Sequence, residues 1–262
     1  MEWEKARKAL LAVIATALLA SGGGCAGQPG ERTIAEDGES DNDPAETVNR
    51  AIFEANLAVD HAVLRPIAKT YSEQVPAEVR QGVHNVVKNL KEPAVAVNDL
   101  LQGNSQHAWQ SVERLAVNTT VGGAGAIDVA AKWGLPRHEA DFGQTLGVWG
   151  VGEGPFVELP LLGPSNLRDA VGTAVDFAFD PLTYVGGAAA TAVGAGRSGA
   201  EVVDTRTAHL KDLDELERNS VDYYAALRSV YRQHRTSEIQ TAKALEQPKE
   251  GRVDISLPEP SP

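Results

Sequence analysis

The chain has 262 residues, of which 42% are hydrophobic and 5% aromatic. This composition is sufficient for one folded domain of moderate size with tails. The formal net charge is −12, with 24 Lys and Arg against 36 Asp and Glu, and the chain has no basic stripe. These charges argue against nucleic acid as a partner, and also against electrostatic docking onto an anionic membrane surface. Any attachment to a membrane must therefore use lipid or apolar contact.

The first 25 residues have the pattern of a targeting segment. Basic residues precede an apolar run over residues 9–20, which is too short to span a bilayer, and small residues then lead to Cys25, the only cysteine. The pattern resembles the lipobox of bacterial lipoproteins, with Gly22 where Leu is usual. We therefore expect residues 1–24 to be a signal peptide and Cys25 to carry the lipid anchor. An ordinary secretory peptide is the alternative, and it would leave a free thiol in an oxidising compartment.

The mature chain divides by composition into a tether, a domain and a tail. Residues 25–42 are rich in Gly and acidic side chains, so we expect a disordered tether there. Over residues 43–235 apolar side chains recur at spacings of three and four, and no stretch alternates with period two. This predicts an all-α domain. The periodicity is lost beyond residue 235, so residues 236–262 are expected to be a disordered tail.

The most informative stretch is Phe142–Pro164. Six glycines and three prolines interrupt it too often for a regular helix or strand, yet it is too apolar for a solvated linker. Each buried backbone amide without a partner costs about 1–3 kcal/mol. The stretch must therefore pack against helices of the same protein, or lie at membrane depth beside a water-filled cavity.

Three motifs in and after this stretch identify a family. They are FGQTLG at 142–147, WGVGEGPF at 149–156 and LPLLGPSNLRD at 159–169. These motifs resemble the MlaA family, also called VacJ lipoproteins, which often has Tyr at the position of Phe156 and Thr at that of Asn166. Further matching blocks extend in order over most of the mature chain.

The resemblance implies a fold and a function. The fold would be a ring of amphipathic helices in the inner leaflet of the outer membrane of a Gram-negative bacterium, around a central amphipathic channel. The protein would remove mislocalised phospholipid from the outer leaflet and so maintain lipid asymmetry. The implied partners are a porin trimer in the membrane and a soluble periplasmic phospholipid carrier. The implied ligand is a glycerophospholipid, with no cofactor.

Two sets of residues are candidates for the site. We expect Gly150, Gly152 and Gly154 to form the hinge of a loop that gates the channel, with Trp149 and Phe156 against apolar surface. The alternative is a rigid buried loop in which glycine only permits packing. A second set could contact lipid phosphate: Arg65, Arg114 and Arg168.

The sequence lacks the motifs of an enzyme. Its six histidines are scattered, none lies in a metal-binding or acyl-transfer motif, and there is no Gly-x-Ser-x-Gly element. We therefore expect no catalytic residue and no metal. The main alternative function is a structural envelope lipoprotein that scaffolds porins without carrying lipid, and a phospholipase is a more distant one.

Overall fold

The computed structural model describes residues 42–184 and 187–246. The chain divides into two units between Asp41 and Asn42, and all the described residues belong to the second unit. The predictions for the signal peptide, the anchor at Cys25 and most of the tether fall outside the described residues, as do residues 247–262 of the expected tail.

The described part of the chain is mostly helical, as the sequence predicts. A π-helical turn at Asp60–Leu64 joins α2 to α3, and a 3-10 turn at Pro181–Tyr184 follows α9. The helices are α2 (Glu46–Val59), α3 (Arg65–Gln74), α4 (Ala77–Asn89), α5 (Glu92–Leu101), α6 (Ser105–Thr120), α7 (Val129–Lys132), α8 (Phe142–Val148), α9 (Leu167–Phe179), α10 (Ala188–Ala208), α11 (Leu210–Asn219) and α12 (Tyr223–Glu246). Two short strands, β1 (Phe156–Leu159) and β2 (Gly163–Asn166), form a hairpin.

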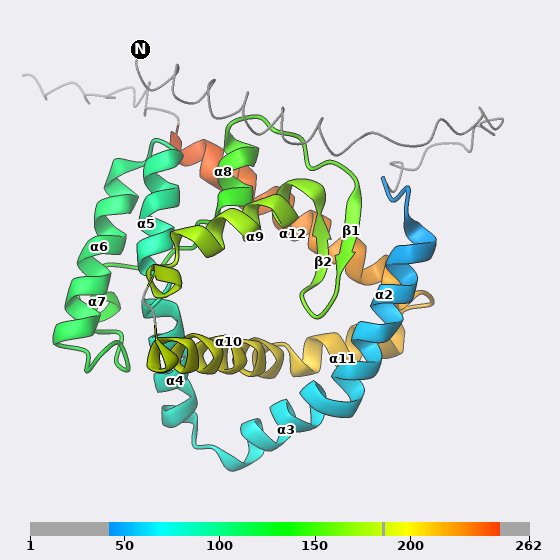
Figure 1. Cartoon of the computed structure of the whole chain (residues 1–262), viewed down its shortest axis with the longest axis horizontal. Helices are drawn as coiled ribbons and strands as arrows, with labels where there is room; N and C mark the ends of the chain where they lie inside the picture. Colours follow the sequence, from blue (N-terminus) through cyan, green and yellow to red (C-terminus); the bar gives the residue numbers. More distant parts are fainter. Residues whose placement is uncertain (1–41, 185–186, 247–262) are drawn as a thin grey trace, which may run out of the picture. The chain divides into compact units, whose positions relative to one another are not determined.

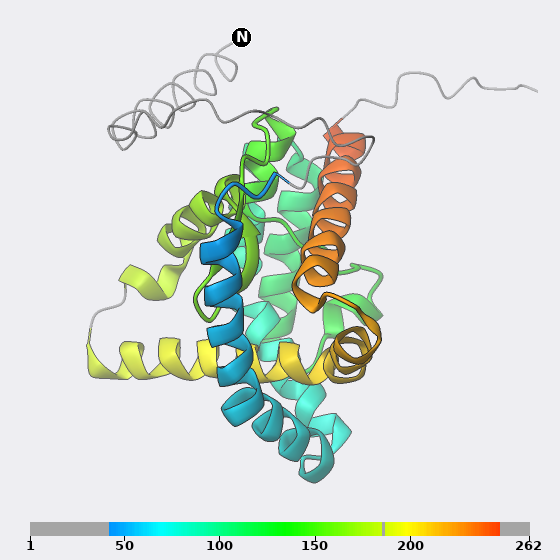
Figure 2. The same ribbon diagram turned by 90° about the vertical axis from the view of Figure 1, so that its right-hand side faces the viewer.

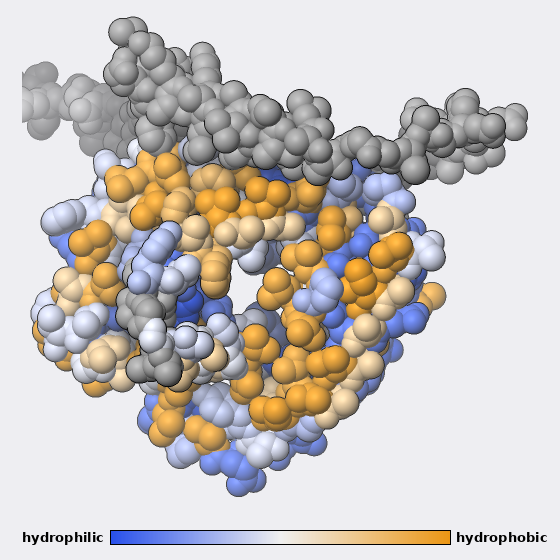
Figure 3. Space-filling view, viewed as in Figure 1, coloured by the Kyte–Doolittle hydropathy of each residue, from blue (hydrophilic) through white to orange (hydrophobic). Residues whose placement is uncertain are grey.

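Within this unit the elements are arranged in a ring (Figure 1), and the space-filling view shows an opening at its centre (Figure 3). The packed pairs include α5 with α6, α8 with α9 and α12, and α10 with α3 and α4. Turned by 90°, the unit shows α10 running across the direction of α12 (Figure 2). Over the described residues, none of the helices combines the length and the hydropathy needed to cross a membrane.

The Phe142 stretch begins with a helix, which corrects the expectation of irregular backbone. Asp141 caps α8 by accepting a hydrogen bond from the backbone N–H of Gln144 (2.9 Å), and every residue of α8 is buried. Gly143 faces Gly172 of α9 so closely that a Cβ on Gly172 would lie 2.6 Å from Cα of Gly143. The glycines therefore permit helix–helix contact here, and the stretch packs against helices of the same protein.

Buried polar side chains connect α8 to its neighbours. Gln102 donates to Oγ1 of Thr145, and Thr145 donates to Oδ1 of Asn98 (3.0 Å each). The amide of Asn98 in turn donates to Asp176 of α9 (2.7 Å), whose other carboxylate oxygen accepts the backbone N–H of Phe142 (2.9 Å). Because these side chains are hydrogen-bonded to one another, the helix is buried without the penalty of unpaired polar groups.

Two asparagines of α2 hold the hairpin, which the sequence pattern does not predict. The side chain of Asn49 donates to the carbonyl of Phe156 and accepts from the N–H of Glu158 (3.1 Å each). Asn56 likewise donates to the carbonyl of Leu159 (2.9 Å) and accepts from the N–H of Leu161 (2.8 Å). Side chains of α2 thus form hydrogen bonds with backbone groups on the free edge of β1. These hydrogen bonds explain how so short a hairpin is stable.

The C-terminal boundary of the domain also needs correction. Helix α12 continues to Glu246, so residues 236–246 are helical and the expected tail cannot begin at 236. Ile239 is 8% exposed and packs against Gly147, where a Cβ would meet its side chain at 2.8 Å. One apolar residue on the buried face, within a charged segment, is enough to extend the packed helix.

Candidate functional site

A cavity of about 850 Å³ lies within the opening. Its walls come from α2, from the end of α4 and the start of α5, from residues 137–141, from the hairpin, and from α9 to α12. Figure 3 shows the opening, with apolar residues above, below and to the right of it and hydrophilic residues visible deeper inside. The volume lies within the range typical of small-molecule sites, roughly 300–1,000 Å³.

The turn of the hairpin supplies much of the apolar wall. Leu161 and Leu162 line the cavity, and each is 67% exposed. Leu161 also has φ +64°, a left-handed backbone conformation that is uncommon for a residue with a side chain. Farther along the chain, Phe177 lines the cavity at 67% exposure. Large apolar side chains are therefore presented to the cavity rather than packed in the core.

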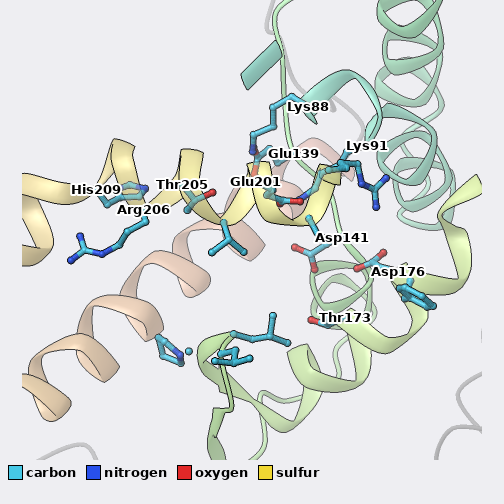
Figure 4. A pocket seen from close by; sticks show the side chains of 18 of the residues that line it. Lys88, Lys91, Glu139, Asp141, Thr173, Asp176, Glu201, Thr205, Arg206 and His209 are labelled. Atoms are coloured by element: carbon cyan, nitrogen blue, oxygen red, sulfur yellow. The ribbon is translucent and has the colours of Figure 1, made fainter. Parts of the chain in front are cut away.

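The polar wall consists of ion pairs between separate elements. Lys88 contacts Glu139, Lys91 contacts Glu201 of α10, and Arg197 contacts Asp180. Figure 4 shows the first two pairs close together, with Asp141, Asp176 and Thr173 below them in the view. At the other end of α10, Arg206 binds Asp60 through two hydrogen bonds of 2.7 and 2.9 Å. All four cations therefore have a carboxylate partner.

Two acids of the wall resist ionisation. Glu158 is 2% exposed, and burial raises its pKa to about 7, although a hydrogen bond from Asn56 (2.9 Å) partly offsets this effect. Burial also raises the pKa of Asp176, despite the hydrogen bonds from Asn98 and from the backbone of Phe142. Loss of hydration is the dominant cause in both cases.

The predicted hinge lies next to the hairpin and outside the cavity lining. Gly150 (φ +90°) and Gly154 (φ +69°) have left-handed backbone conformations, whereas Gly152 does not, and a Cβ on Gly150 or Gly152 would meet nothing within 4 Å. Trp149 is 6% exposed and donates from Nε1 to the carbonyl of Leu101 (2.8 Å). Phe156 is 3% exposed and packs in a cluster with aromatic side chains of α2 and α12.

The predicted phosphate contacts are wrong for two of the three arginines. Arg114 is fully buried, with Glu92 and Asp128 as ion-pair partners, and Arg168 is 8% exposed and binds Asp169. Both side chains are occupied inside the protein and cannot reach a lipid. Arg65 is partly exposed but pairs with two carboxylates of α11 and does not line the cavity.

Sequence reasoning missed the cations that do line the cavity. They come from separate parts of the chain: Lys88, Lys91, Arg137, Arg197 and Arg206. One signal was available in α10, where Arg197, Glu201 and Thr205 recur every four residues and so share one helix face. The other positions become neighbours only through the fold.

Known proteins similar to this chain come from several bacteria. The Escherichia coli (strain K12) protein named intermembrane phospholipid transport system lipoprotein MlaA is 38% identical over 199 residues, which cover 74% of this chain and 77% of that protein. The protein of the same name from Haemophilus influenzae is 31% identical over 257 residues, covering 96% and 98%. An uncharacterized protein of Rickettsia felis is 35% identical over 208 residues, covering 79% and 82%.

A solved structure and a family model agree with these relatives. The structure, from work on the structural basis for maintenance of bacterial outer membrane lipid asymmetry, matches with a TM-score of 0.66 and 37% identity, covering 75% of this chain and 98% of that chain. The family model described as MlaA lipoprotein matches residues 41–238, a range that includes the hairpin, α8 and every lining residue of the cavity. The chain therefore belongs to the MlaA lipoprotein family.

Proposed function

We propose that this protein is an outer-membrane lipoprotein that removes phospholipid from the outer leaflet through its cavity and passes it to a soluble periplasmic carrier. Its relatives in Escherichia coli and Haemophilus influenzae carry the name of a phospholipid transport lipoprotein. We also propose that Cys25 carries the lipid anchor and that a porin is the partner in the membrane. The observation that supports it best is a cavity with large apolar side chains on one part of its wall and paired charges on another.

An amphipathic cavity lowers the energetic cost of moving a phospholipid out of the membrane. Exposing two acyl chains of about sixteen carbons to water costs on the order of 25 kcal/mol, at about 0.8 kcal/mol per CH₂. Apolar surface from Leu161, Leu162 and Phe177 can shield the chains, while the charged wall near Lys91 and Arg197 can replace the hydration of the head group. A lipid in this cavity would avoid most of that barrier.

A plug in the cavity tests this proposal directly. Thr205 lines the cavity on α10, so Thr205→Trp should fill part of it and leave the outside of the protein unchanged. The matched control is Asp212→Trp, because the side chain of Asp212 is 81% exposed on α11 and lies outside the lining. We expect the plug, and not the control, to reduce co-purified phospholipid measured by mass spectrometry and to raise outer-leaflet phospholipid in a complemented deletion strain.

The outcomes separate transport from scaffolding. If wild-type protein carries no phospholipid, and the plugged variant restores the barrier of the deletion strain as well as wild type does, the protein acts without carrying lipid. Protein level and co-purification of the porin must be equal in all strains, because loss of the protein would mimic the plug.

The gate belongs to the same proposal, with Gly150, Gly152 and Gly154 as the hinge of the hairpin. Gly152→Val should fold normally, because its backbone is ordinary and the space around it is open. If the hinge moves, this branched residue will stiffen it and weaken the barrier to detergent in cells. Normal detergent resistance at a normal protein level would instead indicate a rigid loop.

A further inference from the structure

Three possible metal ligands from different elements meet beside the cavity. They are Asp99 of α5, His107 of α6 and His138, which lies in the segment between α7 and α8. One donor atom from each lies within 4.8 Å of the others, and this is the one such group found in residues 42–184 and 187–246. No motif links the three residues in the sequence, so the group exists only in the folded protein.

The contacts within the group are short and partly buried. Nε2 of His138 lies 2.7 Å from Oδ2 of Asp99, which is 3% exposed. The hydroxyl of Ser111 lies 3.4 Å from both atoms, and the rings of His107 and His138 are 4.6 Å apart. Nδ1 of His138 is buried without a hydrogen-bond partner among the described residues. The ring can bind a metal beside Asp99 only through Nε2, so its proton must then lie on Nδ1.

We propose that Asp99, His107 and His138 bind a divalent transition-metal ion, with Zn²⁺ the best match. Two imidazoles and one carboxylate are a ligand set that Zn²⁺ accepts, at about 2.0–2.2 Å from each donor. The donor atoms lie within 4.8 Å of one another, so the side chains must move closer together to reach that geometry. Three protein ligands leave a fourth position for water, and Ser111 lies close enough to hydrogen-bond to that water.

The ion would stabilise one wall of the cavity. Residues 133–141 form neither helix nor strand, yet this segment places Arg137 and Glu139 at the cavity. Backbone hydrogen bonds from residues 133–135 attach its start to α7. Side-chain contacts add to these, such as the hydrogen bond from Arg114 to the carbonyl of Leu135 (2.5 Å). A metal held by His138 would fasten the segment to α5 and α6, and ligand binding to the folded state raises its stability.

A second histidine–aspartate pair provides a matched control. Nδ1 of His84 lies 2.7 Å from Asp204, the same separation as in the pair of His138 and Asp99. His84 belongs to no three-ligand group in the described part of the chain. His84→Ala therefore removes an equivalent hydrogen bond without removing a proposed ligand.

The experiment measures Zn²⁺ binding by the full chain, purified in detergent without a polyhistidine tag. Equilibrium dialysis with elemental analysis should give one Zn²⁺ per chain, and thermal unfolding should shift upward when Zn²⁺ is added. His107→Ala should weaken binding at least about 100-fold and abolish the shift, because losing a ligand costs more than the 10–100-fold typical of its supporting hydrogen bonds. His84→Ala should bind like wild type.

Further measurements distinguish the loss of a metal ligand from misfolding and from nonspecific binding of Zn²⁺ at the surface. The helix cap at Asn104 uses the backbone N–H of His107 (3.2 Å) and not its side chain. His107→Ala should therefore melt at the same temperature as metal-free wild type. Asp99→Asn should also lose binding, and Co²⁺ should give the strong visible absorption of a tetrahedral site in wild type alone. The proposal is overturned if His107→Ala binds as tightly as wild type, or if His84→Ala weakens binding equally.

Discussion

Glu158 couples the stability of the cavity wall to pH. Its pKa is about 7 in the folded protein because it is buried, against about 4.5 when the chain is unfolded. The folded state therefore holds a proton more tightly, so the contribution of Glu158 to stability is fully present below pH 4.5 and is lost as the pH rises through 7. At about 1.36 kcal/mol per pKa unit, the loss is about 3 kcal/mol.

The variant Glu158→Gln should remove this pH dependence. Gln keeps an oxygen that can accept the hydrogen bond from Asn56 and carries no charge. We expect it to be about 3 kcal/mol more stable than wild type at pH 8 and equal to it near pH 4.5, measured by urea unfolding in detergent. Glu215→Gln, an exposed change on α11, should leave the pH profile unchanged. Equal profiles for wild type and Glu158→Gln would contradict the assignment.

Arg114 is expected to contribute to folding rather than to lipid binding. Its side chain is fully buried and pairs with Glu92 and Asp128. Asp128 also pairs with Arg137, so Arg114→Met would leave the buried carboxylate of Glu92 uncompensated and should cost about 3–5 kcal/mol. Asp222→Asn breaks an ion pair with Arg50 at the surface, where the side chain of Asp222 is 41% exposed and that of Arg50 is 37% exposed. This change should cost at most about 1 kcal/mol. Urea unfolding of both variants tests this, and equal losses would show that burial does not matter.

The arginines also show where sequence reasoning stops at this scale. A positive charge in a matched motif indicates that the residue matters, but not what it contacts. Arg114 meets Asp128 and Glu92 across loops, and Arg168 meets the residue that follows it. Because a buried charge requires a partner, the missing information was the burial of these residues.

At the scale of elements, the crossing of α8 and α9 depends on two glycines. A Cβ on Gly172 would lie 2.6 Å from Cα of Gly143, a backbone atom that cannot move aside. Gly172→Ala should therefore separate the helices and cost about 3 kcal/mol. In α10, a Cβ on Gly199 meets nothing within 4 Å, so Gly199→Ala should gain up to about 1 kcal/mol through helix propensity. A lower free energy of unfolding for Gly172→Ala together with a higher one for Gly199→Ala, both measured in urea, would support this role of the two glycines. A stabilising effect of Gly172→Ala would refute it.

Most helices were predictable from periodicity, and the exceptions have physical causes. Helix α8 was missed because glycine usually breaks helices, whereas Gly143 and Gly147 serve here to let α9 and α12 approach. The hairpin was missed because Gly163 and Pro164 are poor strand formers, and its stability comes from the side chains of α2. The end of α12 was missed because Ile239 alone marks its buried face. In each case tertiary packing outweighed local preference.

At the scale of the whole molecule, the cavity joins residues that lie far apart in the sequence. Asp60 meets Arg206, and Lys91 meets Glu201, and no local pattern predicts such pairs. The amphipathic channel itself was an expectation from family resemblance, and composition alone would not indicate it. The fold determines which charged side chains face the cavity and which of them pair with one another. These pairs affect which phospholipid head group can bind there.

We expect the cavity to prefer zwitterionic over anionic phospholipid. Among the described residues, the lining carries five cationic and eight acidic side chains, and each of these cations contacts a carboxylate. A phosphate that binds a cation releases that carboxylate, which an ammonium group on the same lipid can neutralise. Phosphatidylethanolamine meets this need, and phosphatidylglycerol does not.

Mass spectrometry of co-purified lipid, compared with the lipids of the same membrane, measures this preference. Phosphatidylethanolamine should be enriched over phosphatidylglycerol in wild type, and less so when purification is done in high salt, because salt screens charges at the partly exposed wall. The double variant Glu201→Gln with Asp180→Asn removes two acids that face Lys91 and Arg197. It should bind a larger share of phosphatidylglycerol, whereas Glu215→Gln should match wild type. A wild-type preference for phosphatidylglycerol, or a double variant with unchanged lipid content, would show that the wall charges do not select the head group.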